Sequence, residues 1–161
     1  MTRIAVIVCA GLLLAAELAS GAGGLSFVCR ADNDLYRAVT AGGTKYARFD
    51  DAATAVQAAP AGTGVLILAD GYPQKTTVVA NNIFTKAAAK RLRLLIEYPG
   101  QLPGLQVAKP VSTHVQRVVI NSDFFGAGLK KLRIVSVNGL HYTPISAKAP
   151  HLVAARVAGF D

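Results

Sequence analysis

Short apolar runs without polar alternation constrain the fold of this chain more than any other feature. Residues 25–29, 65–69 and 92–96 form such runs, the second within the stretch "GVLILADGYP". A strand that is apolar on both sides is buried on both faces of its sheet. Patterns typical of helices lie between several of these strands, which predicts parallel β-α-β units. The sequence therefore predicts an α/β fold whose parallel sheet is covered on both faces.

Three helices are predicted from their residue spacing and their capping residues, in "NDLYRAV", "DDAATAVQAA" and "NNIFTKAAAKR". Asp32 or Asn33 is placed to cap the first helix, and Asn81 or Asn82 is placed to cap the third. Short side chains of this kind accept hydrogen bonds from the first free N–H groups of a helix. In the second helix, small apolar residues recur at helical spacing, which predicts one buried face.

The apolar runs after the Pro/Gly-rich segment 99–110 follow one another more closely. They cover residues 117–120, 132–137 and 151–157. Part of the sheet is therefore predicted to be mixed rather than purely parallel. The last residues, "ARVAGFD", have the pattern of a strand that enters a loop. We therefore expect a fragment of a longer protein, with a sheet that is incomplete at its C-terminal end.

The first 22 residues have the layout of a secretory signal peptide. Arg3 supplies a positive charge, residues 4–16 are apolar, and small residues follow in "ELASGAGG". The apolar run is short for a membrane span. We expect cleavage after Gly21 or Ala22, an α/β domain over residues 23–161, and a secreted or periplasmic protein without a stable membrane span. An uncleaved anchor is the alternative.

Cysteine usage leaves one thiol in the predicted mature chain. Cys9 lies in the leader and Cys29 in the apolar run "LSFVC". One cysteine forms no internal disulfide, so the core alone must stabilise the fold. In this apolar setting a buried structural thiol is favoured over a nucleophile.

The net charge of +8 is spread along the chain, with clusters at "KRLR" (90–93) and "KKLR" (130–133). Each cluster precedes a predicted strand, which is typical of solvated helix ends and strand entries. Basic residues are not interleaved with aromatic ones, so we expect no nucleic-acid partner. The charge favours attraction of anionic glycans or cell-surface polymers.

Polar residues follow the predicted strands, and ligands of open parallel sheets bind beyond the carboxyl ends of the strands. The candidate catalytic residues are Asp70, Glu97, Asp123 and His141. The candidate ligand-binding residues are Asn33, Asp34, Tyr36, Arg37 and Tyr72. Each of these residues also has a local explanation as a helix cap or turn residue.

These polar side chains would form a rim along the strand ends, and such a rim allows several kinds of chemistry. Two carboxylates in unlike environments act as acid and base, with His141 as a candidate base. A set of carboxylates also holds hard cations such as Mg²⁺ or Ca²⁺, and Asn, Tyr and Asp grip sugar hydroxyls. No cofactor is required by the sequence. No metal ligands are predicted, because histidines and cysteines lack the spacing of a zinc site.

The strings "FVCRADNDLYRAV", "GVLILADGYP", "RLLIEYPGQLPGL", "RVVINSDFF" and "HLVAARVAGFD" resemble the N-terminal part of large secreted bacterial proteins. Those proteins carry a class I glutamine amidotransferase-like domain, and many are linked to polysaccharide use. The resemblance implies a flavodoxin-like or amidotransferase-like, doubly wound, mostly parallel sheet. It does not imply glutamine hydrolysis, because Cys29 lacks the G-x-C-x-G turn that activates the family's thiol.

A second, local resemblance concerns "FDDAATAVQAAPAGTGVLILADGYPQ". This stretch is similar to the opening of secreted pectin-lyase-like β-helix proteins, in which a capping helix precedes the first strand. A β-helix repeats short strands with little helix. The helix and strand predicted over residues 81–96 count against it.

The sequence therefore predicts a secreted α/β module of a carbohydrate-related protein, which binds or hydrolyses saccharides at the strand-end rim. A non-catalytic scaffold or interaction module and a pectin-lyase-like β-helix fragment are the alternatives. Nothing in the sequence indicates an oligomeric state.

Overall fold

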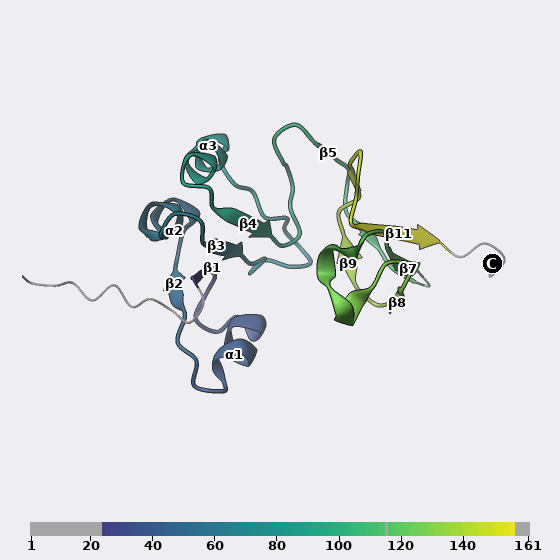
Figure 1. Cartoon of the computed structure of the whole chain (residues 1–161), viewed down its shortest axis with the longest axis horizontal. Coiled ribbons are helices and arrows are strands. Elements are labelled where there is room, and N and C mark those ends of the chain that lie inside the picture. Colours follow the sequence, from purple (N-terminus) through teal and green to yellow (C-terminus); the bar gives the residue numbers. More distant parts are fainter. Residues whose placement is uncertain (1–23, 115, 157–161) are drawn as a thin grey trace, which may run out of the picture.

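The computed structural model describes residues 24–114 and 116–156. Two parts lie side by side, a parallel sheet with its helices and a set of antiparallel strands (Figure 1). The first part follows the order β2-β1-β3-β4, and all of its neighbouring strands are parallel. Its strands are β1 (Leu25–Val28), β2 (Ala47–Phe49), β3 (Gly64–Ile67) and β4 (Arg93–Ile96).

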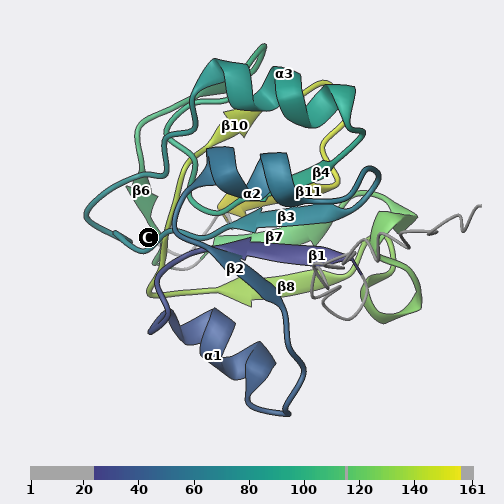
Figure 2. The same cartoon turned by 90° about the vertical axis from the view of Figure 1, so that its left-hand side faces the viewer.

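The helices of the first part cover both faces of the parallel sheet. They are α1 (Asp34–Thr40), α2 (Ala52–Ala58) and α3 (Asn81–Ala89). Figure 2 shows α2 and α3 together on one face and α1 on the other. The prediction of an α/β fold with a parallel sheet and covering helices is confirmed for this part of the chain.

Two apolar clusters correspond to the two faces of the sheet. On the α2/α3 face, Val56 and Ile83 from the helices pack with Val65 and Ile67 from β3. On the α1 face, Phe27 is the centre of a smaller cluster and makes edge-to-face contacts with Tyr36 and Tyr46, at centroid distances of 5.4 and 5.3 Å. Burial of these side chains is the main favourable contribution to the stability of the sheet.

Polar side chains define where α1 and α2 begin. Asn33 caps α1 through Tyr36 N, as predicted, and Asp51 caps α2 through Thr54 N. The bonds from the Thr54 N–H and hydroxyl hold the pKa of Asp51 below its ordinary value, because they favour its charged form. The predicted cap of α3 by Asn81 or Asn82 is wrong, since Ala80 occupies that position without a side-chain bond.

The end of α2 is capped from a distant part of the chain. The Lys90 ammonium, beyond the end of α3, donates to the carbonyl oxygens of Val56 and Gln57 at 2.9 and 2.7 Å. A cation at this position also interacts favourably with the helix dipole. Lys90, the first residue of the "KRLR" cluster, therefore connects the end of α3 to the end of α2.

The second part contains only short strands and 3₁₀ turns. Its central sheet has the order β11-β7-β8, and both pairings are antiparallel. The two-stranded sheets β5-β10 and β6-β9 lie beside it. The bounds of these elements are β5 (Gln106–Val107), β6 (Val111–Ser112), β7 (Gln116–Ile120), η1 (Asp123–Phe125), η2 (Ala127–Leu129), β8 (Ile134–Val137), β9 (His141–Tyr142), β10 (Ile145–Ser146) and β11 (Leu152–Arg156).

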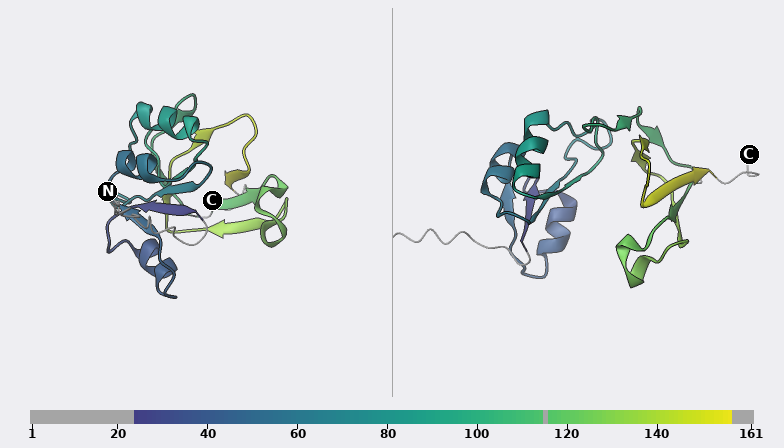
Figure 3. Two further views of the ribbon diagram at one scale, coloured as in Figure 1. Left: turned by 60° about the vertical axis from the view of Figure 1, so that its left-hand side comes forward. Right: turned by 45° about the horizontal axis from the view of Figure 1, so that its top comes forward.

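The later strands are antiparallel to one another, but the prediction that they belong to the same, partly mixed sheet as β1, β3 and β4 is wrong. Parallel neighbours need a long crossover that is usually helical, whereas η1 and η2 are the only helical turns between β7 and β8. The chain instead reverses direction and pairs antiparallel, in a layer apart from the parallel sheet (Figure 3). The ends of β7 and β8 therefore do not join the strand ends of the first part.

Two further predictions concern the overall architecture. A β-helix is excluded, because α2 and α3 lie between successive parallel strands. Within residues 24–114 and 116–156, no helix has the length and apolarity needed to cross a membrane. The predicted signal peptide lies outside the described residues and stays a prediction.

Two valines with opposite exposure test the assignment of the core. Val65 is 0% exposed and Val78 is 68% exposed. We expect Val65→Ala to lower the free energy of unfolding by about 2 kcal/mol, since it deletes buried apolar volume and leaves a cavity. The same change at Val78 is expected to cost less than about 0.5 kcal/mol. Urea unfolding followed by circular dichroism measures both, and equal losses would contradict the assigned core.

Candidate functional site

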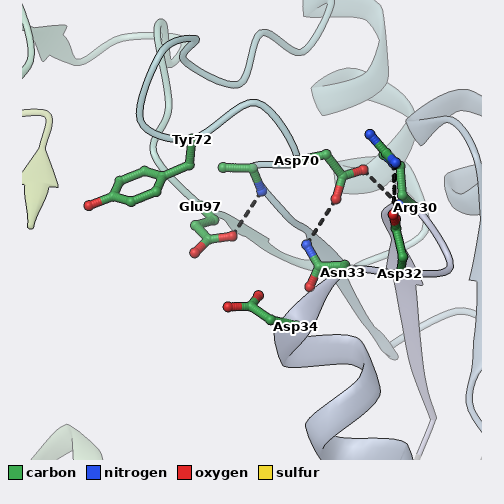
Figure 4. Close-up of a pocket in the computed structure, with 8 residues that line it drawn as sticks. Arg30, Asp32, Asn33, Asp34, Asp70, Tyr72 and Glu97 are labelled. Carbon is green, nitrogen blue, oxygen red and sulfur yellow. Dashed lines mark hydrogen bonds and ion pairs between the residues drawn. The ribbon is translucent and has the colours of Figure 1, made fainter.

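The carboxyl ends of β1, β3 and β4 meet at one edge of the parallel sheet and surround a polar pocket. Its volume is about 410 Å³. Figure 4 shows the side chains of Asp70, Asn33, Asp34 and Glu97 near one another, in the segments that follow these three strands. The lining residues are Arg30, Asp32, Asn33, Asp34, Ala69, Asp70, Tyr72 and Glu97. We call this cavity the polar pocket.

Asp70 connects the end of β3 to the loop between β1 and α1. One of its carboxylate oxygens accepts a hydrogen bond from the Arg30 backbone N–H at 2.6 Å. The other accepts from the Asn33 side-chain amide at 2.8 Å. Asn33 in turn accepts from Tyr36 N at 3.2 Å as the cap of α1. Asp70 therefore positions the helix cap as well as lining the pocket.

Glu97 has an equivalent position at the end of β4. Its Oε2 accepts from Ala69 N at 2.8 Å, while its own N–H donates to Ile67 O at 2.9 Å. This pair of bonds continues the parallel ladder one step beyond the strands. The Glu97 carboxylate is thereby held beside the segment that carries Asp70.

Arg30 and Asp32 form the rim of the polar pocket on the β1 side. The guanidinium of Arg30 donates two bonds to the Asp32 carboxylate, at 3.0 and 2.7 Å. Both side chains are exposed, so solvent screens the pair and its contribution to stability is small. Neither residue is among the predicted site residues, although both follow the first strand in "CRADND".

Tyr72 brings the second part of the molecule to this edge. Its phenol oxygen accepts a hydrogen bond from the His141 backbone N–H at 2.7 Å. Its ring makes edge-to-face contacts with the rings of Tyr98 and His141, at centroid distances of 5.0 and 6.3 Å. His141 therefore comes close to Tyr72 although it belongs to β9, and it does not line the polar pocket itself.

Three predicted site residues lie elsewhere. Tyr36 packs against Phe27 under α1, and Arg37 lies exposed further along this helix. Asp123 lies in η1 of the second part, where its carboxylate accepts from Lys131 N at 3.3 Å. The predicted convergence of Asp123 with Asp70 and Glu97 is wrong, because β7 is not a strand of the parallel sheet.

The structure provides no preformed cation site in the part of the chain that it describes. There, no group of three or more His, Cys, Asp or Glu side chains is arranged to hold a metal ion. The carboxylates of the polar pocket instead accept hydrogen bonds from protein N–H groups. The Mg²⁺ or Ca²⁺ considered from the sequence therefore has no geometric support.

Cys29 is unsuited to nucleophilic catalysis. It is 3% exposed at the end of β1. Burial raises the pKa of its thiol to about 11, and the nearby Asp70 carboxylate adds to this effect while Arg48 opposes it. Because the thiolate is the reactive form, Cys29 stays unreactive near neutral pH. This agrees with its interpretation as a structural thiol.

Comparison of the chain with protein-family models, with curated proteins and with solved structures gives no match. The two resemblances drawn from short sequence strings have no support from a matched relative. Fold alone does not specify function, so the geometry of the polar pocket carries the functional argument.

The structural role of Asp70 is testable by an isosteric substitution. Asp70→Asn leaves one acceptor oxygen for two donors and turns an NH₂ group toward one of them. We expect the free energy of unfolding to fall by about 1 kcal/mol. Asp34→Asn is the control, because Asp34 accepts only from its neighbour Leu35 N among the bonds of the structure. An unchanged urea midpoint for Asp70→Asn would contradict the assigned network.

The buried thiol predicts slow chemical labelling. In a Cys9→Ser background, Cys29 is the only thiol. We expect a disulfide reagent at pH 8 to label the folded protein about a hundredfold more slowly than the urea-unfolded chain. The pKa of Cys29 in the folded protein lies above the ordinary value of 9.0. Burial of the protonated thiol therefore stabilises the fold below pH 9, and this stabilisation is lost as the pH rises toward about 11. Rapid labelling of the folded form would refute this assignment.

Proposed function

We propose that the polar pocket binds a saccharide and that the protein is a secreted or periplasmic carbohydrate-binding module. The observation that carries the proposal is that Asp70 and Glu97, from the ends of neighbouring strands, line one open cavity with Asn33 and Tyr72. Sugar hydroxyls both donate and accept hydrogen bonds. Carboxylates, an amide and a phenol offer the matching acceptors and donors.

The charge of the polar pocket narrows the class of saccharide. Its lining contains four carboxylates and one guanidinium, a formal charge of −3, although the chain as a whole carries +8. Like charges across a binding site disfavour a ligand by several kcal/mol in the most unfavourable cases. Neutral or amino sugars are therefore favoured over uronic acids, in spite of the basic composition.

Binding is better supported than hydrolysis. Glycoside hydrolysis requires one carboxyl group that stays protonated near neutral pH, and apolar burial provides this in known enzymes. Asp70 and Glu97 are both exposed. In addition, each of the two Asp70 oxygens already accepts a bond from the protein. These features suit a positioned acceptor of ligand hydrogen bonds.

We also infer that the parallel part is a flavodoxin-like, doubly wound unit. The strand order β2-β1-β3-β4 and the helices on both faces support this. In such sheets ligands bind where the chain reverses its direction of winding, between the first and third strands. Arg30 and Asn33 follow β1 and Asp70 follows β3, so the polar pocket lies at this point. The amidotransferase-like resemblance then concerns the fold, since Cys29 is buried.

A different observation favours a second candidate function, a non-catalytic interaction module. Phe124 in η1, Leu132 in the turn before β8 and Ile134 in β8 are 70%, 72% and 62% exposed. Large apolar side chains that are exposed in one contiguous patch mark surfaces that contact other molecules. This function concerns the second part of the molecule and does not compete for the polar pocket.

Two isosteric substitutions test the proposed function. An array of neutral, amino and uronic saccharides identifies binders, and calorimetric titration gives their affinities. We expect Glu97→Gln to weaken binding about tenfold, because it removes a charge-assisted acceptor while the amide oxygen still accepts from Ala69 N. The control Asp123→Asn, which lies outside the pocket, is expected to bind like the wild type. Equal effects of the two variants would contradict the site.

A further inference from the structure

A second cavity adjoins the polar pocket and differs from it in chemistry. Its volume is about 350 Å³, and Tyr72 and Glu97 line both cavities. Three of the five tyrosines of the chain line it, namely Tyr72, Tyr98 and Tyr142. Pro99, Leu140, His141, Thr143 and Ile145 complete its wall. We call this cavity the aromatic cleft.

The walls of the aromatic cleft come from both parts of the molecule. Tyr72, Tyr98 and Pro99 follow β3 and β4, whereas His141 and Tyr142 form β9. The bond from His141 N to the Tyr72 phenol spans 69 residues of sequence and connects the two walls. In Figure 4 the Tyr72 side chain extends away from Asp70, toward strands of the second part. Tyr72 thus separates the polar pocket from the aromatic cleft.

Tyr98 is held firmly in its position. It is buried, its ring lies edge-on to Tyr72, and its hydroxyl donates to Pro73 O at 3.3 Å. Its backbone has a φ of 49°, in the left-handed region that is unfavourable for a bulky residue. Such conformations persist only where the surroundings impose them, and they occur preferentially at ligand sites.

We infer that the aromatic cleft is a second saccharide subsite, so that the ligand is an oligosaccharide that passes from the polar pocket over Tyr72 into the cleft. This inference rests on the proposed saccharide-binding function. The hydroxyl edge of one sugar unit bonds the carboxylates of the polar pocket. The apolar C–H face of a following unit packs against the aromatic rings, which offer large contact areas at low entropic cost.

The sizes of the two cavities agree with an extended ligand. Ligand pockets measure about 300–1,000 Å³, and each cavity alone is at the lower end of this range. They share Tyr72 and Glu97, and within residues 24–114 and 116–156 the second carboxylate oxygen of Glu97 accepts no hydrogen bond. That oxygen is placed to accept a bond from the sugar unit at the junction. A ligand confined to one cavity would leave the residues that line the other cavity without a ligand contact.

Chain length of the ligand is the variable that tests this inference. Titrations compare the disaccharides with the hexasaccharides of the neutral cello-, xylo-, manno- and chito-oligosaccharide series. We expect a hexasaccharide to bind at least about tenfold more tightly than its disaccharide, as expected for added anchor contacts. Because the chain contains no tryptophan, its intrinsic fluorescence comes from tyrosine. Since three of its five tyrosines line the cleft and one of these also lines the polar pocket, the fluorescence is expected to change more with the hexasaccharide than with the disaccharide.

Three substitutions at two positions then test whether the aromatic cleft causes the tighter binding of the hexasaccharide. Tyr142→Ala is expected to abolish the advantage of the hexasaccharide, and Tyr142→Phe is expected to retain it, because the ring and not the hydroxyl makes the contact. His141→Ala serves as a second variant that keeps the fold, since its side chain is exposed and its backbone N–H still bonds Tyr72. It is expected to reduce the advantage of the hexasaccharide.

The outcomes separate the inference from the proposed function. If hexasaccharide and disaccharide bind equally and the cleft variants have no effect, while Glu97→Gln weakens both, the second subsite is refuted and the saccharide function stands. If neither these oligosaccharides nor any saccharide of the array, amino sugars included, binds the wild-type protein, the proposed function fails and the inference fails with it.

Discussion

The parallel register of β1, β3 and β4 is the constraint on which the site depends. Val28, Ile67 and Ile96 are aligned across the three strands. The ladder continues past them, since Leu68 N donates to Val28 O at 3.0 Å and Glu97 N to Ile67 O at 2.9 Å. Because the register aligns the strand ends, the segments that follow leave the sheet at one edge. The polar pocket is the space that they enclose.

The second part of the molecule completes this edge without extending the sheet. Its antiparallel strands are a separate layer in Figures 1 and 3, and β9 brings His141 to Tyr72. Two neighbouring cavities result, with carboxylates on one side of Tyr72 and aromatic rings on the other. This division between a hydrogen-bonding and an apolar surface matches the two kinds of surface that a sugar chain presents.

Much of the first part was predictable, because its signals are local. The apolar runs and helical spacing located β1, β3, β4 and the three helices to within a few residues. β2 escaped prediction because its three residues, Ala47–Phe49, form no apolar run and become a strand only by pairing with β1. Asp70 and Glu97 were predicted together because each directly follows a strand. Asp123 satisfied the same local rule but follows a strand of another sheet.

The sequence by itself determined the three helices, the strands β1, β3 and β4, a polar cap for α1 and the buried character of Cys29, since these depend on neighbouring residues and on apolarity. Only the tertiary structure decided which polar strand ends meet. The bond of Asp70 to Arg30 joins residues 40 positions apart, and that of Tyr72 to His141 joins residues 69 apart. Such contacts depend on strand order and direction, which a short stretch of sequence does not encode, because one apolar run suits a parallel or an antiparallel neighbour equally.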